Sequence, residues 1–392
     1  MRKILILFFV LANIECSKNP ESNHKAYLKK IEIDPKTAET GYLSDIADSV
    51  QFVPLETTQK SLIGNVEKIL VNGDQVFIMD TKLSKAVFVF DLNGRFRYKI
   101  DKAGKGVGEY SKLGDFIVCD KYIELYDENT RNILKYNISN GSYISTLHVD
   151  LWFKFFEKTD NEDYIIQTRK MVNFYKSKPL DYDLIFISDQ RKIRNKYFPY
   201  DSKLKVNNVA FDLPKVFTRC RNDLYFAKLF LDTVYKVQNN SLVPVFYFDY
   251  GKYKLTQNYL TMPSDKIKEK LKYPGDEAFG HVIHCVNDQY IFFTFGFKED
   301  LTDPQNWYFG IFFQNEKRSK IYSRLINDVY DTEIEIPITK HPIAHYNDKL
   351  VFLLNPYDIA TYIDKNKIAV NNELNIDKYA NPVLMFVTIK TD

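Results

Sequence analysis

The chain has 392 residues, 45% of them hydrophobic and 27% charged, and its formal net charge is +3. A charge this close to balance, without a basic block, argues against a nucleic-acid partner. Aromatic residues, mostly Tyr and Phe, make up 15% of the chain. Because these side chains suit pleated, half-buried surfaces, the composition favours β structure.

Residues 1–16 have the layout of a secretory signal, with a basic start and an apolar run from Ile4 to Ala12 that is too short to span a bilayer. Cys16 at this point predicts a bacterial lipoprotein whose mature chain begins at the lipidated cysteine. The alternative is ordinary secretion, because Glu15 stands where such signals favour a small residue. We expect a cell-envelope protein that meets the membrane through its lipid anchor only.

The residues after Cys16 contain no acidic run of the kind expected in surface-exported lipoproteins. This favours a protein that faces the periplasm over one at the outer-membrane surface.

One sequence signal occurs six times: a polar turn that contains Asp, followed at once by a short apolar segment. Asp and Asn in such turns bond to the local backbone, which ends one strand and starts the next. The apolar segments begin at Val76, Tyr122, Tyr164, Leu224, Tyr290 and Leu350. Short antiparallel strands at a period of roughly 40 to 50 residues are typical of propeller blades, and the longer later intervals indicate loop insertions.

A second apolar strand follows most copies of this signal. These strands begin at Ala86, Ile133, Leu184, Thr233 and Tyr308. We therefore predict an all-β fold, a six-bladed β-propeller of four-stranded antiparallel blades over residues 46–392. Residues 17–45 are expected to form a linker and N-terminal extension, and a short helical insertion is expected near residues 263–272, where Ser264 could cap it.

Two further segments alternate like strands at the two ends of the predicted propeller. They are "SVQFVPLE" from Ser49 and "NPVLMFVTIK" from Asn381. A ring of blades needs a latch between its ends, because an open sheet edge invites aggregation. We expect these two segments to share one sheet.

Several motifs resemble those of a known family. They are "VPLETTQKSLIG" from Val53, "VFIMD" from Val76, "FDLNGRF" from Phe90, "GKGVGEY" from Gly104, "DTVYKV" from Asp232, "FDYGK" from Phe248 and "NPVLM" from Asn381. On these residues the chain resembles the six-bladed β-propeller lipoproteins of Gram-negative gut anaerobes, which are related at fold level to NHL-repeat and TolB-like propellers. The resemblance implies the fold and carries no catalytic residue onto this sequence.

The "GKGVGEY" stretch, with Gly104, Gly106 and Gly108, could be taken for a phosphate-binding loop. It lacks the spacing of a P-loop and leads into another strand instead of a helix. We therefore interpret it as the backbone crossing between blades one and two, and we expect valine at Gly106 to impair folding before any binding.

Histidines and acidic residues are the candidates for metal ligands. His281 and His284 should point to opposite faces of a strand, and Pro342 leaves the geometry of His341 and His345 open. A Ca²⁺ or other divalent ion in the central channel is conceivable, but the acidic residues at blade turns suit backbone bonding equally well; examples are Asp80, Asp127 and Asp189. We assign no metal ligands and no cofactor.

Trp152 and Trp307 are the candidate binding residues, because aromatic side chains in loops can stack on sugar rings; packing is the alternative, since apolar residues surround both. Cys119, Cys220 and Cys285 are expected to be buried thiols with at most one disulfide.

The predicted function is a binding module for a glycan, a peptide or an envelope partner. The alternative is a metal-dependent hydrolase or lactonase with its site in the central channel.

Overall fold

The computed structural model of the chain describes residues 28–200, 215–255, 275–297, 307–329, 342–357 and 377–391, single positions at 266, 269, 272 and 360, and the backbone of 334–336. Cys16 and His341 lie outside the described residues. The expected helix near 263–272 also lies largely outside them, although its three described positions, Lys266, Glu269 and Lys272, are helical.

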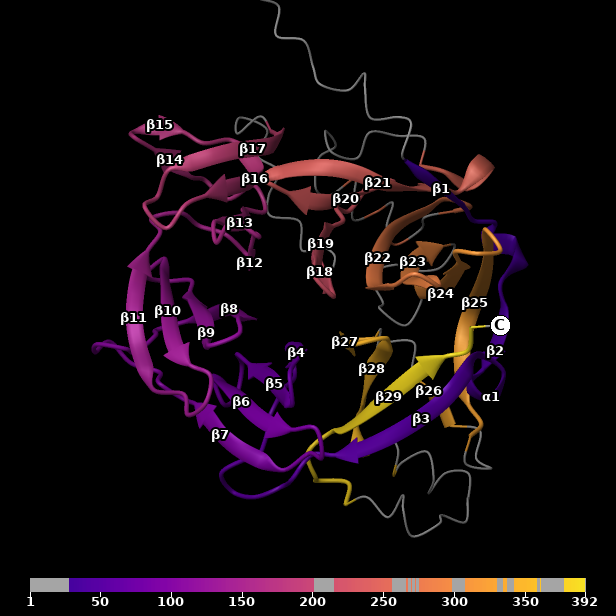
Figure 1. Cartoon of the computed structure of the whole chain (residues 1–392), viewed down its shortest axis with the longest axis horizontal. Coiled ribbons are helices and arrows are strands. Elements are labelled where there is room, and N and C mark those ends of the chain that lie inside the picture. Colours follow the sequence, from indigo (N-terminus) through magenta and orange to yellow (C-terminus); the bar gives the residue numbers. More distant parts are fainter. Residues whose placement is uncertain are drawn as a thin grey trace, which may run out of the picture.

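The described strands form six antiparallel blades, as predicted (Figure 1). Blade 1 contains β4 (Lys68–Asn72), β5 (Gln75–Asp80), β6 (Ala86–Asp91) and β7 (Phe96–Ile100). Blade 2 contains β8 (Leu113–Val118), β9 (Tyr122–Asp127), β10 (Asn132–Asn137) and β11 (Tyr143–His148). Blade 3 contains β12 (Phe155–Lys158), β13 (Tyr164–Gln167), β16 (Tyr182–Ile187) and β17 (Ile193–Pro199), with a small hairpin of β14 (Phe174–Tyr175) and β15 (Lys178–Pro179) inserted.

The remaining three blades follow the same order. Blade 4 contains β18 (Phe217–Cys220), β19 (Asp223–Phe226), β20 (Thr233–Gln238) and β21 (Ser241–Asp249). Blade 5 contains β22 (Ala278–Val286), β23 (Tyr290–Phe297), β24 (Trp307–Phe313) and β25 (Arg318–Asn327), to which β26 (Ile334–Ile336) is added. Blade 6 contains β27 (Ala344–Tyr346), β28 (Lys349–Leu354) and β29 (Val383–Ile389) from the C-terminal part.

The second strand of each blade is the apolar segment that the repeated sequence signal predicts, and it is buried on both sides. In β5, Val76 and Ile78 pack towards blade 6, whereas Phe77 and Met79 pack towards blade 2. Because side chains alternate along a strand, a continuous apolar run fills the two interfaces on either side of its blade. The outer strands are more polar; β11, for example, is mostly exposed.

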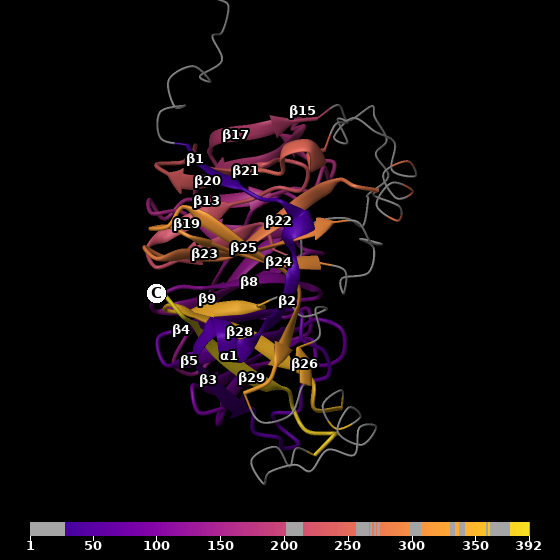
Figure 2. The ribbon, with the colours of Figure 1, turned by 90° about the vertical axis from the view of Figure 1, so that its right-hand side faces the viewer.

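The N-terminal residues are built into the edge of the ring (Figures 1 and 2). Strand β1 (Lys29–Glu32) pairs in parallel with β21 of blade 4, and β2 (Glu39–Tyr42) pairs in parallel with β25 of blade 5. The turn α1 (Leu43–Ile46) then leads into β3 (Ala47–Pro54). A short 3₁₀ turn, η3 (Pro35–Thr37), lies between β1 and β2, and a second one, η4 (Gly251–Tyr253), follows β21. The described part of the N-terminal extension therefore covers the outer edges of two blades.

The ring closes at blade 6, where β3 is the outermost strand and pairs antiparallel with β29. The register places Val53 opposite Leu384 and Val50 opposite Val387. Figure 1 shows the indigo β3 beside the yellow β29. The predicted sharing of one sheet by the two ends of the propeller is thereby confirmed.

Candidate functional site in the central channel

The six inner strands surround a cavity of about 810 Å³ on the axis of the ring. Its lining comes from all six blades, through β4, β8, β12, β18, β22 and β27 and the residues beside them. Every blade repeats the same alternation of strand direction, so the inner strands all begin at one end of the channel and end at the other. A cavity of this size is in the range that holds small-molecule ligands.

Cationic side chains outnumber carboxylates in the lining of this channel. The cations are Lys68, Lys154, Arg169, Lys215, Arg219 and Arg221. The carboxylates are Glu67, Asp115 and Glu157. Basic residues are therefore twice as numerous as acidic residues in the lining, although the whole chain is nearly balanced in charge.

Asp115 lies where blades 1, 2 and 3 meet in the channel wall. Its carboxylate accepts a hydrogen bond from Lys68 Nζ at 2.7 Å and another from the backbone N–H of Phe156 at 3.1 Å. The Lys68 ammonium also donates to the carbonyl of Phe116 at 2.7 Å. Asp115 and Lys68 thus join the beginnings of three inner strands and neutralise each other.

The other two lining carboxylates also have basic partners. Glu157 forms an ion pair with Arg219 at 3.5 Å, which links blades 3 and 4. Glu67 lies 3.9 Å from Lys82 Nζ and accepts a hydrogen bond from the Thr81 hydroxyl. None of the three carboxylates therefore needs Lys154 or Lys215 as its counter-ion.

Lys154 and Lys215 are half-buried lysines. Lys154 directly precedes β12, the inner strand of blade 3, and Lys215 lies two residues before β18, the inner strand of blade 4. Among the described residues neither ammonium has a carboxylate within ion-pair distance; Lys154 lies 5.9 Å from the ring of Phe155. Burial lowers the pKa of Lys215, and the positive charge of Lys68 acts in the same direction. These two lysines give the channel mouth its uncompensated charge.

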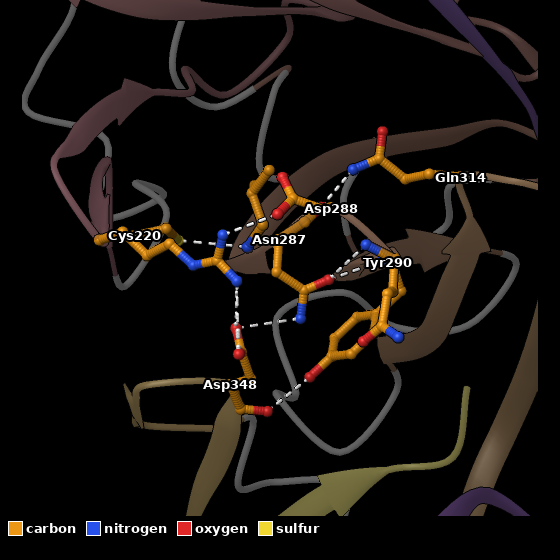
Figure 3. Close-up of polar contacts among 9 residues, drawn as sticks. Cys220, Asn287, Asp288, Tyr290, Gln314 and Asp348 are labelled. Atoms are coloured by element: carbon orange, nitrogen blue, oxygen red, sulfur yellow. Dashed lines mark hydrogen bonds and ion pairs between the residues drawn. The ribbon is translucent and has the colours of Figure 1, made fainter.

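A polar network links blades 4, 5 and 6 at the opposite end of the channel (Figure 3). Arg221 bridges Asp288 at 2.9 Å and Asp348 at 3.4 Å. Asn287 donates to Asp348 at 3.2 Å, and the hydroxyl of Tyr290 donates to the Asp348 carbonyl at 2.7 Å. Because its charges are paired, this end is structurally tied and contrasts with the mouth that carries Lys154 and Lys215.

Two thiols lie behind this network. The Cys220 sulfur accepts a hydrogen bond from the backbone N–H of Val286 at 3.2 Å, next to Cys285. Hydrogen bonds from the Cys285 thiol and from His345 lower the pKa of Cys220, and the same contact between the sulfurs, with burial, raises the pKa of Cys285. Both cysteines are free and buried, as expected from the sequence, and half-buried Cys119 is free as well.

The candidate binding residues Trp152 and Trp307 do not line the channel. Trp152 is half-buried between blades 2 and 3, where its backbone makes two hydrogen bonds to Asn173 and its ring faces the Arg131 guanidinium at 5.4 Å. Trp307 begins β24 and packs against the core of blades 3 to 5. The structure does not bring the two residues together at one site, and their part in binding stays a prediction.

The histidines of "HVIH" contact different neighbours. His281 stacks on Phe248 at 4.3 Å between ring centroids, whereas His284 hydrogen-bonds Thr294 at 2.9 Å. The described residues contain no group of three or more His, Cys, Asp or Glu placed to hold a metal ion.

Two of the acidic residues at the blade turns, Asp80 and Asp127, accept hydrogen bonds from backbone N–H groups. The buried carboxylate of Asp80 accepts N–H groups of five residues; they are Gly64, Asn65, Lys82, Leu83 and Ser84. Asp127 holds the equivalent turn of blade 2, including the N–H groups of Ser111 and Lys112. Asp189 is exposed in the turn between β16 and β17. None of the three lines the channel.

The "GKGVGEY" stretch lies between β7 and β8, so it crosses from blade 1 to blade 2 as predicted. The carboxylate of Glu109 accepts the N–H of Gly106 at 2.8 Å, within the loop itself. The Tyr136 hydroxyl donates to the Gly108 carbonyl at 2.9 Å and ties the loop to blade 2. The loop backbone is therefore held by its own Glu109 and by Tyr136 of blade 2.

Lys154 and Lys215 are the residues that the sequence did not single out. A lysine just before a short apolar segment is the available signal, but β12 and β18, the strands that follow these two lysines, have only four residues each and were not predicted from the sequence. Their convergence with Lys68 depends on ring closure, which brings blades far apart in sequence around one axis.

A closed ring of six four-stranded blades around a channel lined by basic residues defines a six-bladed β-propeller with an axial cavity. The chain belongs to the family described as Domain of unknown function (DUF4934), whose model matches residues 28–388. No match to a curated protein is found. Within the described residues no helix is long and apolar enough to cross a membrane.

Solved structures similar to this chain include a protein from Bacteroides fragilis that is described as exported, with 16% identity and a TM-score of 0.71, covering 93% of this chain and 100% of that one. This likeness shows the fold. A streptogramin B lyase matches with 11% identity and a TM-score of 0.40, covering 87% and 98% of the two chains. BamB from Moraxella catarrhalis matches with 11% identity and a TM-score of 0.36, covering 87% of this chain and 97% of that one.

Proposed function

We propose that this protein is an exported binding module that holds a small ligand, such as a glycan or a peptide segment of an envelope partner, in its central channel. The observation that carries the proposal is the 810 Å³ cavity, which all six blades line with both apolar and polar side chains. A rigid ring whose loops and axis present such a cavity suits recognition, because little ordering is needed on binding.

Export and membrane attachment belong to the same proposal. The signal-like residues 1–16 support export, and Cys16 supports a lipid anchor at the N-terminus. The exported protein from Bacteroides fragilis that shares the fold is in keeping with this location. Labelling with radioactive palmitate, with Cys16→Ala as the comparison, tests the anchor: label on the wild type alone is expected, and label on neither protein would refute it.

A metal-dependent hydrolase or lactonase is not proposed as a second function. Such an enzyme needs several carboxylate or imidazole ligands that converge on one ion. The three carboxylates of the described lining are each paired with a basic or hydroxyl group, so no observation there favours this reaction.

Blocking the channel tests the binding proposal. Val118 lies half-buried in the lining at the end of β8, beside the core between blades 1 and 2. Val118→Trp adds bulk to the channel wall there, and thermal unfolding verifies that the variant folds. Val107→Trp is the matched control, because Val107 is 91% exposed in a loop away from the channel. Calorimetric titration with neutral and acidic oligosaccharides and tripeptides should detect a ligand whose binding Val118→Trp abolishes and Val107→Trp retains. Equal binding by both variants would move the site elsewhere.

A further inference from the structure

The channel has one charged feature that a general binding module does not require. Its three lining carboxylates have partners, whereas Lys154 and Lys215 have no carboxylate partner among the described residues. Lysines on a protein surface need no counter-ion because water solvates them. Half-buried lysines in a confined channel are different, since desolvation makes an uncompensated charge costly.

We propose that the ligand of the channel carries carboxylate groups, and that the ammonium groups of Lys154 and Lys215 bind them as counter-ions. This inference rests on the proposed function and specifies the chemistry of its ligand. Lys154 and Lys215 precede the inner strands of adjacent blades, so one ligand at the channel mouth can meet both. A carboxylate there restores the pairing that the other lining charges already have.

The surroundings of the two lysines favour an anion over a cation or a neutral ligand. Burial and the charge of Lys68 both lower the pKa of Lys215. A carboxylate bound beside Lys215 would oppose both effects and favour its charged form. Among the lining carboxylates, Asp115 already accepts hydrogen bonds from Lys68 and from the backbone of Phe156. Glu157, whose charge acts to raise the pKa of Lys215, is paired with Arg219. An incoming anion therefore does not have to displace an existing ion pair.

The shape of the channel limits the size of this anion. A volume of 810 Å³ accommodates an organic molecule of a few sugar rings or a few amino-acid residues. Apolar side chains of the wall, such as Phe155, Phe217 and Tyr346, offer surface to the uncharged part of such a molecule. Uronic-acid sugars and glutamate-containing peptides share this combination of carboxylates and an apolar frame.

The experiment compares matched probes on the full mature chain. Trigalacturonic acid and its methyl ester form one pair, and triglutamate and triglutamine form the other. Within each pair only the carboxylates change. We expect the acidic member of one pair to bind at least about tenfold more tightly than its neutral partner, because a hydrogen bond to a charged group contributes more free energy than one to a neutral group. The pair that shows this preference identifies the source of the carboxylates.

Lys154→Met and Lys215→Met should each weaken binding of that acidic probe about tenfold and leave the neutral probe unaffected. Lys60→Met is the matched control, because Lys60 is exposed outside the channel. Thermal unfolding of each variant verifies that it folds. Raising the salt concentration should weaken acidic-probe binding to the wild type more than to either channel variant.

The outcomes separate the inference from the proposed function. Equal binding of acidic and neutral probes, lost in Val118→Trp, would overturn the carboxylate inference and leave the binding module standing. An acidic preference that survives in both lysine variants would also overturn it. If neither acidic probe binds the wild type, the carboxylate inference is refuted. The proposed binding function is refuted only if Val118→Trp weakens the binding of no ligand.

Discussion

Ser49 and Thr388 share a hydrogen bond of 2.9 Å between their hydroxyl groups although 339 positions separate them in the sequence. The bond lies between β3 and β29, the two strands that close the ring. Closure by strands from both ends makes the last blade dependent on the N-terminal part of the chain. The stability of the ring should therefore be sensitive to apolar contacts at this junction and insensitive to its exposed polar ones.

Leu384→Ala tests the closing junction. Leu384 is fully buried opposite Val53 in the core between blades 6 and 1. Removing its side chain should lower the free energy of unfolding by about 2 to 5 kcal/mol. Ser49→Ala, which deletes only the exposed hydroxyl bond, should change it by less than about 0.5 kcal/mol. Urea unfolding followed by circular dichroism measures both, and similar midpoints for the two variants would contradict a closing role for this core.

Asp80→Ala tests the turn that the repeated signal produces. The buried carboxylate accepts five backbone N–H groups, so its removal leaves several buried donors without an acceptor. We expect a loss of about 3 kcal/mol in the free energy of unfolding. Asp189→Ala is the matched control, because Asp189 is exposed, and it should cost less than about 0.5 kcal/mol. Equal effects would mean that the Asp80 bonds do not stabilise blade 1.

The pKa of Asp80 adds a dependence on acid. Burial acts to raise this pKa, but the backbone N–H bonds from Leu83, Ser84 and Asn65 outweigh it, so the pKa is lowered overall. A carboxylate with a lowered folded-state pKa stabilises above the unfolded-state value of 3.8, and the stabilisation is lost as pH falls through the folded-state pKa. The difference between wild type and Asp80→Ala should therefore shrink below about pH 4.

Gly108→Ala tests the crossing between blades 1 and 2. Gly108 has a φ of +74°, and an added Cβ would lie 2.6 Å from Cγ of Tyr143. Both the left-handed backbone and the contact disfavour alanine, so we expect a loss of about 2 kcal/mol. Gly106→Ala should cost less, because its Cβ would meet only the flexible Glu109 carboxylate, at 3.1 Å. Thermal unfolding ranks the two, and an equal or larger effect at Gly106 would be inconsistent with this account.

The sequence predicted the architecture well because each blade has its own local signal. The polar turn and the apolar second strand lie within a few residues of each other. The two closing strands can also be recognised, because β3 carries apolar residues at Val50 and Phe52 and β29 is an almost continuous apolar run. Fully buried second strands such as β23 are continuous apolar runs, which a single sequence displays directly.

The candidate site was much harder to predict. Lys154, Lys215 and Lys68 converge only because three blades surround one axis, and nothing local distinguishes them from surface lysines. Trp152 and Trp307 were predicted as binding residues because aromatic side chains can stack on sugar rings, yet neither residue lines the channel. The order of strands within each blade determines which strand is innermost and which of its side chains face the lumen. A single sequence does not display this order.

His281→Phe tests the effect of an unpaired buried imidazole on acid stability. Neither ring nitrogen of His281 has a hydrogen-bond partner among the described residues, and the ring is buried against Phe248. Burial lowers the pKa of His281 from 6.5 to about 3. The unfolded chain therefore binds a proton at this residue between about pH 6.5 and pH 3, whereas the folded protein does not.

The wild type should consequently lose stability as pH falls through this window, by up to about 1.4 kcal/mol per pH unit from this residue alone. Phenylalanine keeps the stacked ring and has no proton to bind, so the variant should match or exceed the wild type at pH 7 and lose less below pH 6. Urea unfolding at pH 7, 6, 5 and 4 gives the two profiles. Parallel profiles for the two proteins would show that His281 is protonated, or finds a polar partner, in the folded state.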